Sequence, residues 1–124
     1  MGKFVIKQNS KGYTFNLKAA NGEVIGTSGE VLSTLQTCKN SIESVTNNAQ
    51  IANVEDQTVE GYQEEKCPKF EIYLDKKGEY RFRLKARNGE PILASEGYTA
   101  KAGCKNGIDR VRRNVVDATV EEAE

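Results

Sequence analysis

The sequence contains no histidine and only three cysteines among its 124 residues. Without histidine, the usual zinc sites, His-based acid–base catalysis and Ser-His or Cys-His nucleophile pairs are excluded. Cys38, Cys67 and Cys104 are odd in number and widely spaced, so they predict no disulfide framework. We expect no cofactor and no metal, with Cys38 and Cys104 buried and Cys67 the exposed thiol.

The chain also has a formal net charge of zero, because 18 Lys and Arg residues balance 18 Asp and Glu residues. Such a chain has no global field that would draw it to nucleic acid or to a membrane surface. No apolar run approaches the roughly 18 residues of a membrane span, and "MGKFVIKQ" at the N-terminus lacks the apolar stretch of a secretory signal. We therefore expect a soluble, cytoplasmic protein with no membrane partner.

What the sequence does contain is an internal duplication. The segment "KFVIKQNSKGYTFNLKAANGEVI" (3–25) matches "KFEIYLDKKGEYRFRLKARNGEPI" (69–92), and "CKNSIESVTNN" (38–48) matches "CKNGIDRVRRN" (104–114). Nearly half of the aligned positions are identical, and the polar segment 57–68 lies between the copies. This pattern predicts a first repeat at 1–56, a linker at 57–68 and a second repeat at 69–124.

Each repeat has the pattern of a β-β-β-α-β unit. Alternating apolar residues predict two strands, and Asn21-Gly22 and Asn88-Gly89 predict the turns into a third. A three-residue loop with Gly22 in a left-handed bulge would pair Leu17 with Ile25 and keep both on the core face. Apolar residues at helical spacing then follow, and a short strand around Val54 or Val120 closes each unit.

One unit of about 55 residues with a single helix is near the lower limit for an independent core. Two such units, each with an open sheet edge, would gain stability by pairing. The short final strands lie next to the linker, so we expect the two repeats to exchange them.

Three blocks carry a resemblance to a known family. They are the "FRLKARNGEPI" block, "SEGY" at 95–98 and "CKNGI" at 104–108. With these blocks the chain resembles the DUF1508 or YegP-like family, also called UPF0339, over nearly its whole length and twice. The resemblance implies an α+β fold in which both units share one antiparallel sheet, exchange their C-terminal strands and place two helices on one face. It implies a monomer with an internal pseudo-two-fold, whereas single-unit relatives would be homodimers.

The most distinctive surface is the stretch "YRFRLKARNG" in the second repeat. It places a basic residue at every second position, namely Arg81, Arg83, Lys85 and Arg87, and Tyr73 of the preceding strand should lie on the same face. Alternation of this kind is typical of the solvated side of an antiparallel sheet. It is also compatible with an anion-binding site, in which arginine forks hold phosphates and Tyr73 stacks on a base.

We expect a non-enzymatic protein that acts by binding or in a stress-linked structural role. The alternative is weak nucleic-acid or polyanion binding through the basic strand face of the second repeat. A small enzyme is disfavoured, because the sequence has no histidine and predicts no convergent polar pocket. The resemblance supplies no catalytic residue, since the family is uncharacterised in function.

Overall fold

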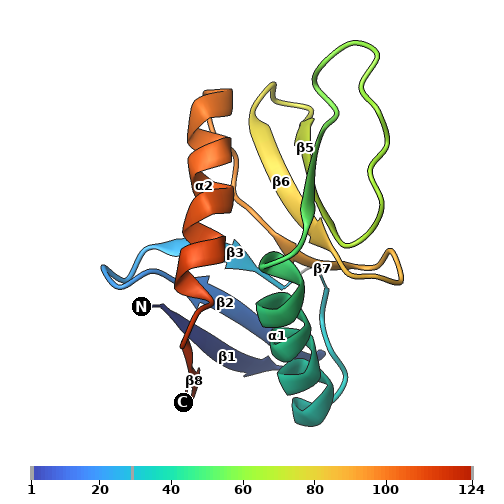
Figure 1. Ribbon diagram of the computed structural model, residues 1–124. Helices are drawn as coiled ribbons and strands as arrows, with labels where there is room; N and C mark the ends of the chain where they lie inside the picture. The colour runs from blue at the N-terminus through green and yellow to red at the C-terminus, as the bar shows by residue number, and fades with distance from the viewer. Residues whose placement is uncertain (1, 29, 124) are drawn as a thin grey trace.

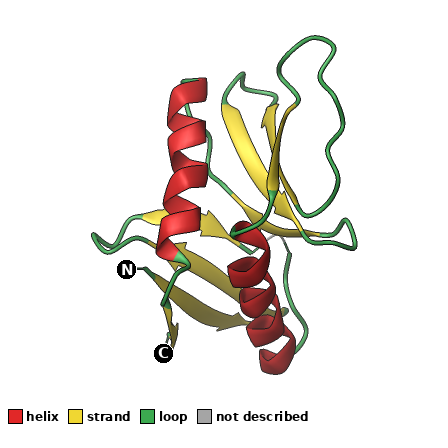
Figure 2. Cartoon of the chain, in the orientation of Figure 1, coloured by secondary structure: helices red, strands yellow, loops and turns green. Residues whose placement is uncertain are grey.

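The computed structural model describes residues 2–28 and 30–123. The elements of the first repeat are β1 (Lys3–Asn9), β2 (Gly12–Lys18), β3 (Val24–Thr27), α1 (Leu35–Ala49) and β4 (Asn53–Asp56). Those of the second are β5 (Lys69–Leu74), β6 (Tyr80–Lys85), β7 (Pro91–Ala94), α2 (Lys101–Asn114) and β8 (Thr119–Glu122). Each repeat therefore has the predicted β-β-β-α-β order, and both helices lie on the same side of the sheet (Figures 1 and 2).

All eight strands form one sheet in the order β4-β5-β6-β7-β3-β2-β1-β8. From the central pair β3 and β7 outward, both halves of the sheet have the same arrangement: the third, second and first strands of one repeat, followed by the fourth strand of the other. At the centre, Thr27 of β3 pairs with Ala94 of β7. A Cβ atom on Gly26 would lie only 2.9 Å from Cγ of Leu93, so the absence of a side chain at Gly26 lets the two halves meet this closely.

The predicted strand exchange is confirmed. β4 of the first repeat pairs with β5 of the second, and β8 of the second pairs with β1 of the first. The expectation of a wholly antiparallel sheet is wrong, because both exchanged strands pair in parallel and the sheet is mixed. Parallel neighbours need a crossover of a dozen or more residues, and segment 57–68 supplies it between β4 and β5.

The predicted register of the first repeat is correct at the loop and wrong one step further on. The N–H of Ala19 donates to the carbonyl of Glu23 at 2.9 Å, and Gly22 has a φ of 87°, so the three-residue loop forms as predicted. However, Leu17 pairs with Gly26 rather than with Ile25, because the register shifts between Leu17 and Lys18. The extra residue of this bulge leaves Ile25 buried without requiring a direct pair.

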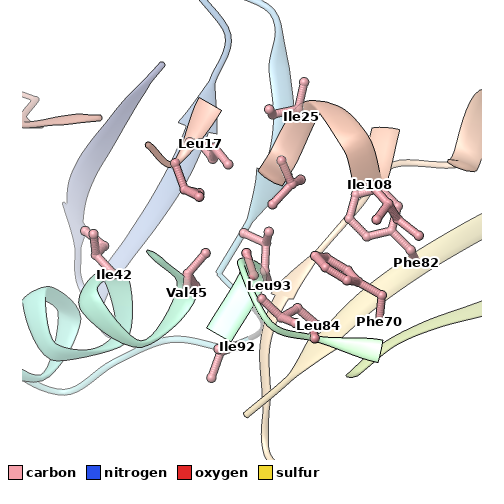
Figure 3. Close-up of a cluster of buried hydrophobic side chains, with 14 of the residues drawn as sticks. Leu17, Ile25, Ile42, Val45, Phe70, Phe82, Leu84, Ile92, Leu93 and Ile108 are labelled. Carbon is pink, nitrogen blue, oxygen red and sulfur yellow. The ribbon is translucent and has the colours of Figure 1, made fainter. Parts of the chain in front are cut away.

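One apolar core joins the two repeats. Figure 3 shows Leu17 and Ile42 of the first repeat in the same cluster as Phe82 and Leu93 of the second. Each helix packs against the second strand of its own repeat and the third strand of the other, α1 on β2 and β7, and α2 on β6 and β3. The predicted helix faces are confirmed, since Cys38, Ile42, Val45, Cys104, Ile108 and Val111 are all buried.

The cysteines offer a test of these faces in solution. Cys38 and Cys104 are fully buried, and burial raises the pKa of both thiols, that of Cys104 to about 11. Cys67, just before β5, is partly exposed. We expect a thiol reagent to label Cys67 much faster than the other two, whose reaction must wait for local opening. Mass spectrometry after timed labelling measures the three rates, and equal rates would contradict the buried helix faces.

Candidate functional site

The basic strand face predicted from the sequence is present on the side of the sheet opposite the helices. Arg81, Arg83 and Lys85 extend from β6, and the guanidinium of Arg83 lies 4.4 Å from the centre of the Tyr73 ring. Arg87 is separated from them, because it follows the end of β6 and lines a groove beside α1. The structure therefore brings four of the five predicted residues together.

Carboxylates neutralise most of this face. Nε of Arg81 donates to Asp75 at 2.7 Å, Nε of Arg83 donates to Glu71, and Nζ of Lys85 lies 3.3 Å from the same Glu71 carboxylate. The hydrogen bond from Arg81 lowers the pKa of Asp75, so this carboxylate remains ionised. The arginines and lysine on β6 are thus already paired within the chain.

A buried ion network on β4 and β5 adjoins the basic residues of β6. Nζ of Lys69 contacts Glu55 at 2.8 Å and Glu71 at 3.2 Å, and the three residues are only 2 to 5% exposed. The linker covers this network, because the N–H of Glu65 donates to Glu55 at 2.7 Å and the Gln57 amide donates to Glu55 at 2.6 Å. The network therefore ties β4, β5 and β6 to segment 57–68.

The charges in this network are stabilised by hydrogen bonds. Burial by itself would raise the pKa of Glu55, but donors from Gln57, Lys69 and the Glu65 N–H outweigh it and lower this pKa to about 2. Burial likewise opposes the charge of Lys69, but its bonds to Glu55 and Glu71 raise its pKa. Burial also opposes the charge of Glu71, but hydrogen bonds from Arg83 and Lys69 outweigh it and lower the pKa of this carboxyl. All three groups are therefore charged at neutral pH.

The first repeat lacks this network. Lys3 and Glu121 occupy the places of Lys69 and Glu55, but they lie 3.5 Å apart with side chains 41 and 55% exposed. Val5 stands opposite Asn16, where the second repeat has Glu71 opposite Arg83. Position 5 is a valine where the second repeat has Glu71, so Lys3 has no second carboxylate there. At this place the first repeat has the exposed ion pair of Lys3 with Glu121.

A polar groove lies on the other side of the molecule, between α1 and the turn that joins β6 to β7. Its wide part has a volume of about 700 Å³ and includes Asn47 and Arg87. Its inner part has a volume of about 250 Å³ and includes Glu30 and Glu90. Asn40, Ser44, Ala86 and Asn88 line both parts, so the groove is continuous.

The walls of the groove can both donate and accept hydrogen bonds. The Asn40 and Asn88 amides and the Ser44 hydroxyl are held on α1 and on the β6–β7 turn. Asn48, at the end of α1, is buried and donates to the Ser44 carbonyl at 2.8 Å, which ties these two lining residues together. Sequence reasoning missed this groove, since its residues come from different repeats.

Two kinds of site are not found in residues 2–28 and 30–123. No group of three His, Cys, Asp or Glu side chains there is arranged to hold a metal ion. In the same residues, no helix is long and apolar enough to cross a membrane.

The chain is similar to short curated proteins of bacteria. It is 59% identical over 54 residues to a UPF0339 protein of Treponema denticola, a match that covers 44% of this chain and 93% of the relative. It is 65% identical over 48 residues to the "UPF0339 protein in ptx operon 5'region" of Stutzerimonas stutzeri, covering 39% of this chain. The matched segment spans only 43% of that second relative.

Two solved structures share the whole fold. The solution structure of the protein of unknown function yegP from E. coli matches with a TM-score of 0.76 and 27% identity, covering 98% of this chain and 91% of that one. A UPF0339 protein of Shewanella oneidensis matches with a TM-score of 0.78 and 30% identity, covering 98% and 90% of the two chains.

The duplication is also visible at the level of the family. The family model described as "Domain of unknown function (DUF1508)" matches residues 9–56 and again residues 75–122. With two matches that together cover most of the chain, the protein belongs to the DUF1508 family as a tandem-repeat, YegP-like member.

Proposed function

We propose that this protein is a non-enzymatic binding module and that its ligand site is the groove between α1 and the β6–β7 turn. The observation that supports the proposal is the convergence of Asn40, Ser44 and Asn88 from two repeats on one continuous groove. A few fixed polar groups at the wall of a concave site are the usual means of orienting a small ligand. Both walls of the groove come from the same chain, so the site would be complete in a monomer.

The groove can be tested by screening small polar compounds against the ¹⁵N-labelled protein by two-dimensional NMR. We expect at least one class of compound to shift the amides of Asn40, Ser44 and Asn88 in a saturable way. The matched control is Ser44→Arg, which places a long side chain in the groove and should abolish those shifts. Hits whose shifts lie elsewhere, or that survive in Ser44→Arg, would contradict the proposal.

Polyanion binding by the basic strand face is the second candidate. The observation in its favour is the Arg83 guanidinium stacked on Tyr73, a pair on which a nucleic-acid base could continue the stack. Against it, Glu71 and Asp75 already pair with Arg81, Arg83 and Lys85, and a phosphate would have to compete with these carboxylates. We therefore expect the basic residues of β6 to stay paired with Glu71 and Asp75 and to bind no polyanion.

We therefore expect no binding of single-stranded RNA or DNA at physiological salt. Fluorescence anisotropy at low and physiological salt measures this, and the control is Arg81→Thr with Arg83→Asn, which gives β6 the side chains of β2. Three phosphate contacts would give a log–log salt slope near −2, from about −0.7 per phosphate on single strands. Micromolar binding by the natural protein that the double variant loses would make polyanion binding the better proposal.

A further inference from the structure

The second repeat shows what can occupy the place of the groove. There, Arg110 of α2 reaches the β2–β3 turn, and its Nη1 and Nη2 atoms donate to the two carboxylate oxygens of Glu23 at 3.2 Å each. This is a bidentate pair between a guanidinium and a carboxylate, in which the planar fork matches the two oxygens. An arginine side chain thus bridges the helix of one repeat and the turn of the other.

The corresponding arrangement of α1 and the β6–β7 turn has no arginine at the position equivalent to Arg110. Ser44 stands six residues after Cys38, as Arg110 stands six after Cys104, and Glu90 follows Asn88-Gly89, as Glu23 follows Asn21-Gly22. The packing is equivalent, since α1 contacts β7 as α2 contacts β3. The carboxylate is therefore kept on the turn, whereas the cation on the helix has been replaced by a short hydroxyl.

The space left by this replacement is open. Ser44 and Glu90 both line the inner part of the groove, which has a volume of about 250 Å³. Its other charged residue is Glu30, and no Lys or Arg of the described chain lines it. The ion pairs among the described residues include Glu23 with Arg110 but none at Glu90. The inner groove is thus an acidic pocket at a position where the second repeat holds a guanidinium.

We infer that the inner groove binds the guanidinium group of an arginine side chain, supplied by a peptide or an arginine derivative. This inference rests on the proposed function of the groove and names its ligand. The guanidinium would pair with Glu90 in the place that Arg110 takes opposite Glu23. Ala86 and Ile92, which are largely buried in the wall, offer apolar surface to the methylene groups of the same side chain.

Arginine fits this pocket better than lysine. The carboxylate of Glu90 can accept two parallel hydrogen bonds from a planar fork. Asn40 and Ser44 of α1 line the same pocket, and their oxygens, which accept from Gln36 and Asn48, each keep a lone pair for a further donor. An ammonium is a compact point charge that is more strongly hydrated and cannot form the same bidentate pair. The pocket should therefore distinguish the two cations, although both are attracted by its two carboxylates.

The experiment titrates N-acetyl-arginine methylamide into the ¹⁵N-labelled full chain. We expect saturable shifts at Asn40, Ser44, Asn88 and Glu90, weaker binding of the matching lysine compound, and none of the neutral citrulline compound. Glu90→Gln should weaken binding by up to about fivefold, because Glu90 is exposed and an exposed ion pair contributes only modestly to affinity. Ser44→Arg should abolish it, since the new side chain would pair with Glu90 as Arg110 pairs with Glu23.

The duplication supplies a gain-of-function variant. Arg110→Ser removes the internal guanidinium from the second repeat, and we expect it to create a second site with shifts around Glu23. No shifts in the groove with the arginine compound, or equal binding of the citrulline compound, would overturn the inference. If other compounds still bind in the groove, the proposed function stands without its guanidinium ligand, and if none does, both fail.

Discussion

Replacing Lys69 by methionine should destabilise the protein by about 3–5 kcal/mol, the usual cost of removing one partner of a buried ion pair. The substitution leaves the Glu55 carboxylate, which is 2% exposed, with hydrogen-bond donors but no cation. Glu71 retains Arg83 and Lys85, so the cost is concentrated at Glu55. Urea unfolding followed by circular dichroism measures the loss.

The chain contains its own control for this experiment. Lys3→Met removes the equivalent lysine of the first repeat, whose partner Glu121 is 55% exposed, and exposed pairs contribute up to about 1 kcal/mol. A second variant, Lys69→Met with Glu55→Gln, should recover part of the stability because it removes the unpaired charge as well. If Lys69→Met cost no more than Lys3→Met, water would have to reach the network, and the covering role of the linker would be wrong.

This contrast between the repeats marks the limit of what the sequence reveals about the basic face. The alternation in β6 correctly placed Arg81, Arg83 and Lys85 on one face, because side-chain direction in a strand has a period of two. It could not show that Glu55 and Lys69 are buried there. Their burial comes from segment 57–68 folding back over the sheet, and the polar composition of that segment predicted only a linker.

The direction of the exchanged strands was unpredictable for a related reason. Val54 and Val120 indicate a short strand, and that property does not depend on whether the neighbouring strand runs parallel or antiparallel. Their side chains are 43 and 48% exposed, so core packing does not fix the strand direction either. The exchange itself could be predicted from the small size of the unit. The register at Ile25 was missed because a bulge keeps this side chain buried while the partner of Leu17 moves by one residue, to Gly26.

The groove could have been suggested by the sequence, although it was not found there. Aligning the repeats places Ser44 opposite Arg110 and Glu90 opposite Glu23, so the alignment shows a serine in place of the arginine and a carboxylate on the turn in both repeats. What the alignment lacks is the contact between Arg110 and Glu23, which lie far apart in the chain and belong to different repeats. Only the folded arrangement shows that these two positions concern one pocket.

The strand exchange leads to the largest effect that we expect. Residues 1–60 alone should form no stable folded monomer. In this fragment β4 has lost its neighbour β5, β1 has lost β8, and α1 has lost β7. The fragment also keeps only half of a core in which side chains of both repeats are in contact. A unit of about 60 residues with both of these defects cannot offset the conformational entropy of folding.

Circular dichroism and sedimentation of residues 1–60 test this expectation. The fragment should be either unfolded or a homodimer in which β4 of each copy pairs with β1 of the other, as β8 pairs with β1 in the full chain. The Treponema relative has about the length of one repeat, since 54 matched residues make up 93% of it, and the same argument predicts that it folds as a homodimer.

Mixing residues 1–60 with 61–124 should restore the fold of the intact chain, because each fragment carries the strand that the other lacks. A monomeric fragment that unfolds cooperatively with the stability of the full chain would show that the exchanged strands contribute little, and the two repeats would then be independent domains.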